Sequence, residues 1–224
     1  MVEWQLLKSQ YYLDRRSGSE NSRLSERTRM KKYKAALLVI DAQRIYTDPK
    51  SELFCRGGKR TVGKINQLIT KFKRTGDAII FIRHEHKTNG SDLGRMFDFA
   101  GEAEDFNFKA GSDEVKYDES LIVPSGSRQI AKRRYSAFTG TNLHQMLKKL
   151  GVKHVYICGF MTNFCCESTA REAHDLDYFV TFVPDATGCP DLPGLSQEKI
   201  RKLVSAFLEA GFAVLKKTSD IVKQ

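Results

Sequence analysis

Three residues of this chain carry side chains suited to proton transfer or nucleophilic attack, and each follows a short aliphatic run. Asp41 ends the first run, Lys132 ends another, and Cys165 follows a third after a glycine-containing turn. A partly desolvated carboxylate suits a general base. A thiol in the first turn of a helix meets the positive end of the helix dipole, which favours the thiolate, and free N–H groups of that turn could hold an oxyanion. Together the three residues are candidates for one catalytic site.

Each residue taken alone also has a structural explanation. Asp41 could be an N-cap or a ribose-binding acid, although no Gly-x-Gly-x-x-Gly supports a dinucleotide. Lys132 begins a basic run that could simply be solvated. A buried cysteine is often a small apolar residue, which is how we interpret Cys55, Cys158 and Cys189. Cys166 competes with Cys165, but it is turned by about 100° around the helix, so only one of the two can face a crevice.

Elements that could position these residues alternate along the chain from residue 34. Aliphatic runs predict strands at 35–40, 78–82, 129–131, 154–158, 179–183 and 213–215, and apolar spacing predicts helices at 62–74, 141–150, 165–174 and 197–209. This alternation predicts a doubly wound α/β domain with a six-stranded, mainly parallel sheet and helices on both faces. Its crevice would lie at the carboxyl ends of the strands. The segment 86–124 has no sustained period and is expected to be a long loop that covers this site.

Composition limits the remaining possibilities. No apolar run is long enough to span a bilayer and the first residues do not resemble a secretory signal, so we expect a cytoplasmic protein. The five cysteines are an odd number without a Cys-x-x-Cys pair, which argues against a disulfide framework or a zinc ribbon. Half of the formal net charge of +10 falls in the first 34 residues. We therefore predict a basic leader or packing arm at 1–33 and a catalytic domain at 34–224, with nucleic acid an unlikely partner because no binding motif accompanies the charge.

Three segments, taken in order, resemble the isochorismatase-like cysteine hydrolases, a family that includes nicotinamidases, N-carbamoylsarcosine amidohydrolases and ureidoacrylate hydrolases. The segments are Asp41 after the first strand, Lys132 before Arg-Tyr-Ser-Ala-Phe, and Cys165 in Gly-Phe-Met-Thr-Asn-Phe-Cys. The resemblance covers about residues 34–218. It implies a catalytic triad of these three residues, with Cys165 rather than Cys166 as the nucleophile.

The resemblance also implies two features of the nucleophile turn. One is a cis peptide bond between Phe160 and Met161, and the other is an oxyanion hole formed by the N–H groups of Met161 and Cys165. Four further side chains near the crevice are expected to contact the substrate: Gln43, Tyr46, Arg83 and Tyr135. Arg83, Arg133 and Arg134 are compatible with an anionic substrate, but at least two of them are more simply explained as solvated surface charges.

The chain departs from the nicotinamidase pattern at a metal site. Nicotinamidases have an Asp-x-His and a further His that bind a divalent ion, whereas this stretch reads Arg83-His84-Glu85-His86. We interpret His84 and His86 as a polar rim and predict no metal and no organic cofactor. Isochorismatases that cleave a vinyl ether have Gly where Cys165 stands, so the thiol favours covalent chemistry.

These observations predict a cysteine hydrolase that cleaves a small amide, ureido or related C–N bond through a thioester. The alternatives are a vinyl-ether hydrolase, in which Cys165 would be a bystander, and a non-catalytic interaction module on the same fold. We expect a small-molecule substrate and a homo-oligomer, either a dimer or a tetramer, with no membrane partner.

Overall fold

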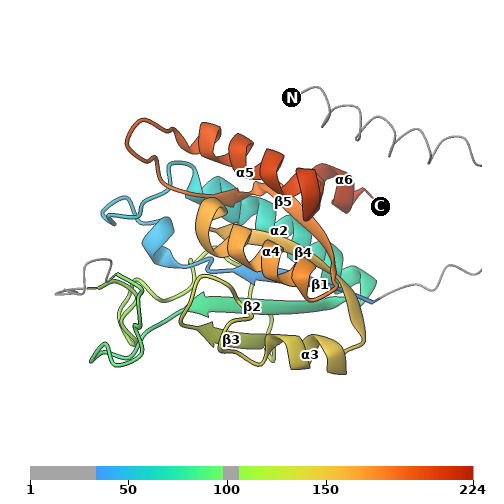
Figure 1. Cartoon of the computed structure of the whole chain (residues 1–224), viewed down its shortest axis with the longest axis horizontal. Coiled ribbons are helices and arrows are strands. Elements are labelled where there is room, and N and C mark those ends of the chain that lie inside the picture. The colour runs from blue at the N-terminus through green and yellow to red at the C-terminus, as the bar shows by residue number, and fades with distance from the viewer. Residues whose placement is uncertain (1–33, 98–105, 224) are drawn as a thin grey trace, which may run out of the picture. The chain divides into compact units, whose positions relative to one another are not determined.

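The computed structural model describes residues 34–97 and 106–223. The predicted basic leader at 1–33 lies outside the described residues and remains a prediction. Within the described part, six strands form one sheet in the order β3-β2-β1-β4-β5-β6 (Figure 1). Every neighbouring pair is parallel, which confirms the predicted doubly wound α/β fold. The strands are β1 (Lys34–Ile40), β2 (Ala78–His84), β3 (Arg128–Lys132), β4 (Val152–Phe160), β5 (Phe179–Gly188) and β6 (Val214–Leu215).

Helices cover both faces of this sheet because alternate strand residues point to opposite sides. On one face, Leu38 and Ile40 pack with the apolar sides of α3, α4 and α5. On the other, Leu37 and Val39 pack with α2 and α6. The helices are α2 (Gly58–Thr75), α3 (Leu143–Lys149), α4 (Glu167–Asp175), α5 (Gln197–Gly211) and α6 (Thr218–Val222). Two single turns, η1 (Arg44–Tyr46) and η2 (Thr162–Cys166), follow the ends of β1 and β4.

Most boundaries lie within a few residues of those predicted, with two informative exceptions. α2 begins at Gly58 rather than at 62, because its first turn has no apolar residues that could reveal a helical period. β5 continues to Gly188, beyond the predicted end at 183, although Pro184 and Asp185 interrupt the aliphatic run. The longer β5 extends well past its neighbour β6, which pairs with it only at Thr181 and Phe182.

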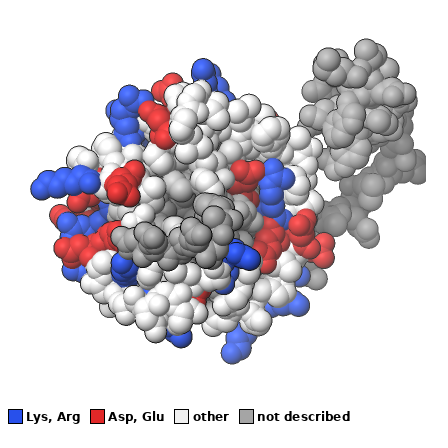
Figure 2. Space-filling view, turned by 60° about the vertical axis from the view of Figure 1, so that its left-hand side comes forward, with Lys and Arg blue, Asp and Glu red and all other residues white. Residues whose placement is uncertain are grey.

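The edge of the sheet where the strands end carries charges of both signs. Figure 2 brings this side of the molecule forward and shows Lys and Arg side chains interspersed with Asp and Glu. None of the described helices is long and apolar enough to cross a membrane. All five cysteines are free and buried.

Candidate active site

The three residues singled out from the sequence meet in one buried cluster. Lys132 Nζ lies 2.8 Å from Asp41 Oδ2 and 3.1 Å from Cys165 Sγ, and it also donates to the Arg134 carbonyl. Asp41 and Lys132 are fully buried and Cys165 is 2% exposed. The lysine ammonium therefore bridges the carboxylate and the thiol in a site that the protein shields from water.

The sheet order explains how the cluster assembles. Asp41 follows β1 and Lys132 ends β3, and β2 lies between these two strands. His84 at the end of β2 is in register with Lys132. The long side chain of Lys132 thus spans the end of β2 to reach the carboxylate, a reach that a shorter cation could not provide.

The backbone around Asp41 is unusually constrained. Asp41 has a φ of 45°, in the left-handed region that Asp tolerates better than most residues. Its N–H donates to the Ile82 carbonyl, which joins the end of β1 to β2. Gly159 on β4 has a φ of 125°, and a Cβ there would lie 1.8 Å from the Ile40 carbonyl oxygen. Only glycine allows β4 to approach this closely to the residue before the acid.

Cys165, the predicted nucleophile, lies in a widened turn between β4 and α4. The peptide bond between Phe160 and Met161 is cis, and residues Thr162–Cys166 form a π-helical turn before α4 begins at Glu167. The Met161 carbonyl accepts hydrogen bonds from the N–H groups of Phe164 and Cys166. No described residue accepts a hydrogen bond from the Met161 N–H.

Burial controls the protonation of this cluster. Burial raises the pKa of the Cys165 thiol to about 12, although the Lys132 charge pulls it down. Burial also raises the pKa of Asp41 above its usual range, against the opposing effect of Lys132. Although burial alone would lower the pKa of Lys132, the negative charge of Asp41 and the close contact with Cys165 raise it above its usual value. The cluster therefore keeps its lysine charged and holds a carboxyl group that is more basic than an exposed one.

The prediction that a helix terminus lowers the pKa of Cys165 is wrong. The thiol precedes α4 in the π-helical turn and is fully enclosed, so loss of hydration outweighs the favourable dipole. With its pKa raised in this way, the thiol keeps its proton at neutral pH. Cys166 is also buried, and burial raises its pKa well above the usual value.

The interpretation of His84 and His86 as a polar rim is also wrong. Both are 1% exposed, and their Nε2 atoms lie 2.9 Å apart. Burial lowers the pKa of both rings and so favours two neutral imidazoles. The Nε2 atom of one ring then donates its hydrogen to the unprotonated Nε2 atom of the other. Phe108 stacks on His84 at a centroid distance of 4.5 Å, so part of the long loop covers the pair. The aromatic residues of that loop were the sequence signal for this burial.

His84 also lies beside the catalytic cluster. Ligand atoms of Asp41, His84 and Cys165 lie within 4.8 Å of one another, close enough to share one metal ion. The Lys132 ammonium, however, contacts both the carboxylate and the thiol. A divalent cation bound by those two groups would lie against this buried positive charge, so the residues present do not fit a metal.

The four expected substrate contacts occupy different places. Gln43 is buried, and its side-chain amide bonds only to backbone atoms of His84 and Val115. Tyr46 is buried and stacks on Phe160 at 5.2 Å.

Arg83 forms an ion pair with Glu85 at 3.1 Å. Tyr135 is half-buried and packs on Phe164, one residue before the nucleophile. Tyr135 and Phe164 therefore present the half-buried aromatic surface next to Cys165.

Comparison with known proteins identifies the family. The sequence profile of the Isochorismatase domain matches residues 35–214, which include all three clustered residues. The chain belongs to the isochorismatase family. It is 30% identical over 181 residues to Nicotinamidase 3 of Arabidopsis thaliana, covering 81% of this chain and 83% of that protein. It is 28% identical over 175 residues to ureidoacrylate amidohydrolase RutB of Variovorax paradoxus, covering 68% of each.

Structural comparison agrees with this assignment. A cysteine hydrolase from Pseudomonas syringae pv. phaseolicola superposes with a TM-score of 0.79 at 25% identity, covering 85% of this chain and 91% of that one. The protein is thus a hydrolase of the isochorismatase family, as the three sequence segments predicted.

Proposed function

We propose that this isochorismatase-family hydrolase cleaves a small amide, ureido or related C–N bond through a thioester on Cys165. The observation that carries the proposal is the Lys132 ammonium, which lies 2.8 Å from the Asp41 carboxylate and 3.1 Å from the thiol. This arrangement joins a base, a cation and a nucleophile in one water-shielded cluster, as covalent acyl transfer requires. The amide and ureido substrates implied by the names of the two relatives support the bond class.

The first half of the reaction forms the thioester. Asp41 accepts the thiol proton while Cys165 Sγ forms a bond to the substrate carbonyl carbon, which makes a tetrahedral oxyanion. The N–H groups of Met161 and Cys165 stabilise that oxyanion, and the unengaged Met161 N–H supports this role. Asp41 then returns the proton to the departing nitrogen as the C–N bond breaks, leaving the acyl group on sulfur.

The second half hydrolyses the thioester. Asp41 removes a proton from water, whose oxygen attacks the thioester carbonyl, and the C–S bond breaks as the thiol regains a proton. The raised pKa of Asp41 suits both roles, because a more basic carboxylate accepts the proton more readily. Lys132 stabilises the negative charge as it moves between the carboxylate and sulfur.

A panel of small amides and ureido acids, with ammonia detection, tests the proposed activity. Brief incubation with a hydrolysed substrate, acid quench and intact-mass analysis should show the acyl adduct on Cys165. Cys165→Ala should lose both the adduct and ammonia release. Retention of most ammonia release in this variant would contradict the thioester route. Cleavage of a vinyl ether by both the wild-type protein and this variant, without ammonia release from the panel, would favour the vinyl-ether alternative. Failure of the wild-type protein to turn over any of the panel would favour the non-catalytic interpretation.

A further inference from the structure

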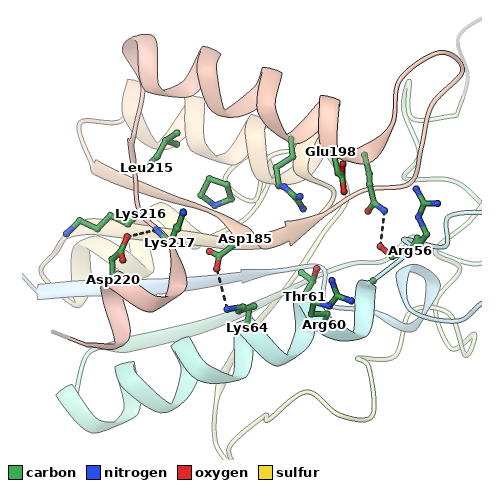
Figure 3. A pocket seen from close by; sticks show the side chains of 14 residues that line it. Arg56, Arg60, Thr61, Lys64, Asp185, Glu198, Leu215, Lys216, Lys217 and Asp220 are labelled. Atoms are coloured by element: carbon green, nitrogen blue, oxygen red, sulfur yellow. Dashed lines mark hydrogen bonds and ion pairs between the residues drawn. The ribbon is translucent and has the colours of Figure 1, made fainter.

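A cavity lies apart from the cluster of Asp41, Lys132 and Cys165, and none of these three residues lines it. It encloses about 620 Å³ between the first turns of α2 and α5, with Pro184 and Asp185 of β5 between them and the chain from β6 into α6 alongside (Figure 3). It exists because β6 has only two residues, so the longer β5 has no neighbouring strand beyond Phe182 on this side. We call this cavity the basic notch. Its six cationic lining residues are Arg56, Arg60, Lys64, Arg201, Lys216 and Lys217.

The notch has more positive than negative charge. Its only acidic lining residues are Asp185, Glu198 and Asp220. Asp185 pairs with Lys64 at 3.7 Å and accepts two hydrogen bonds from Thr218, so its carboxylate is already engaged. In Figure 3 this pair lies on the α2 side of the notch.

Two arginines of the notch have no acidic partner in the part of the chain that the structure describes. Arg56 pairs with Asp191 at 3.3 Å. For Arg60 and Arg201, by contrast, no carboxylate of the described residues lies within ion-pair distance, although Glu198 lies one turn before Arg201 on α5. Their guanidinium groups come from opposite walls, Arg60 from α2 and Arg201 from α5. Both are therefore available to an external anion.

The start of α2 adds to this preference. Its N-cap is Gly57, which offers no side-chain cap, and its first turn has no acidic residue. Of the two cations in that turn, Lys59 is paired with Asp118, whereas Arg60 has no carboxylate partner among the described residues. Cations at this end oppose the helix dipole. α5, in contrast, begins with the Ser196 cap and has Glu198 in its first turn. An anion in the notch would offset the unfavourable charge at the start of α2.

We propose that the basic notch binds the phosphate group of a small phosphorylated molecule, held by Arg60 and Arg201. Each guanidinium group can donate two parallel hydrogen bonds to two oxygens of one anion. A phosphate group has enough oxygens to accept such pairs from both arginines, whereas a single carboxylate has only two oxygens. The volume suits a small molecule, and Pro184 and Leu215 line the notch beside its charged residues. The proposal does not depend on the reaction at Cys165.

Isothermal titration in a phosphate-free buffer tests the proposal, with inorganic phosphate and ribose 5-phosphate as probes and sodium chloride holding ionic strength constant. Both probes should bind at one site, and Arg60→Gln and Arg201→Gln should each weaken binding by at least about tenfold. The matched controls Lys71→Gln and Lys202→Gln remove one charge from the same helices outside the notch and should leave Kd within about twofold. Tighter binding of the ester would identify a phosphorylated metabolite, and equal binding would identify the free ion.

Two further variants keep the test decisive. Lys132→Met removes the cation of the catalytic cluster and should leave phosphate binding unchanged, because that cluster lies outside the notch. Arg60→Lys keeps the charge but loses the planar fork, and it should bind with intermediate affinity. Circular dichroism establishes that each variant is folded. Absence of binding to the wild-type protein, or equal weakening by the notch and control variants, would overturn the proposal.

Discussion

The catalytic cluster and the basic notch use positive charge in opposite ways. In the cluster, Lys132 is fully buried, and its charge is paired with the Asp41 carboxylate. The Cys165 thiol also lies within hydrogen-bond distance of the ammonium group. In the notch, Arg56 exposes 75% of its side chain, and Arg60 and Arg201 lack acidic partners among the described residues. A buried, matched cation adjusts the proton affinity of its neighbours, whereas an open, unmatched one is available to bind a ligand.

The largest expected effect is the loss of the nucleophile. Cys165→Ala should reduce kcat/KM by about 10⁴-fold or more, because the covalent route disappears. Cys166→Ala is the matched control, since it removes the adjacent buried thiol, and it should keep most activity. Steady-state kinetics on a substrate from the amide panel measures both. The reverse pattern, with Cys166 essential and Cys165 dispensable, would show that Cys166 is the nucleophile.

The next effect comes from removing the matched cation. Lys132→Met should lower kcat/KM by about 10²- to 10⁴-fold. The Lys132 charge lowers the pKa of Asp41 and of the thiol, so its loss raises both values. The acid limb of the pH–rate profile should therefore move to higher pH, and alkylation of Cys165 by iodoacetamide should slow at neutral pH.

Arg128→Met is the control for that charge, because Arg128 is exposed at the opposite end of the same strand. It should change neither the pH profile nor the alkylation rate. Full activity and an unchanged profile in Lys132→Met would make Lys132 a structural charge only, and the contrast with the notch would disappear.

An ion pair of intermediate exposure sharpens the comparison further. Lys59 at the start of α2 exposes 60% of its side chain, but Asp118 is buried and lies 2.6 Å away. Burial alone would raise the pKa of Asp118, but hydrogen bonds from Lys59, Ser120 and Thr47 bring it down to about 2. This stabilisation is present above the ordinary carboxyl pKa and is lost as the pH falls toward 2.

Asp118→Asn should therefore lower the free energy of unfolding by about 1 kcal/mol at neutral pH, after allowing for solvent screening of the exposed lysine. The difference from wild type should shrink below pH 4 in urea titrations. Asp113→Asn, which removes an exposed partner of Lys116, is the control and should have a smaller effect. A constant difference across this pH range would show that the carboxyl charge is not the cause.

The smallest expected effect is that of metal removal. Because Lys132 already places a positive charge between the carboxylate and the thiol, chelation with EDTA should change the activity by less than about twofold. Loss of activity that zinc or manganese restores would show that His84 belongs to a metal site.

The sequence predicted the fold well because its strands are aliphatic and its main helices are amphipathic. It also indicated the three residues that meet in the buried cluster, since each follows a predicted strand. It did not predict that the cluster is fully buried, because this burial depends on contacts between segments that are distant in the sequence, such as Phe108 stacking on His84.

The basic notch could not be predicted from the sequence either. Arg60 and Arg201 are far apart along the chain, and each reads as an ordinary surface charge on its own helix. The start of α2 was missed for a related reason, since its glycines and cations have no apolar period. α6 is only five residues long, too short for periodicity to reveal it.

Gly159 limits how this enzyme can be re-engineered. Any larger residue there would collide with the carbonyl of Ile40 and push apart the strands that precede the base and the nucleophile. The separation of these two groups is thus fixed by main-chain packing, and side-chain libraries cannot tune it. Laboratory evolution toward new substrates should hold this glycine constant and diversify Tyr135 and Phe164, whose aromatic surface borders the thiol without setting its distance from the acid.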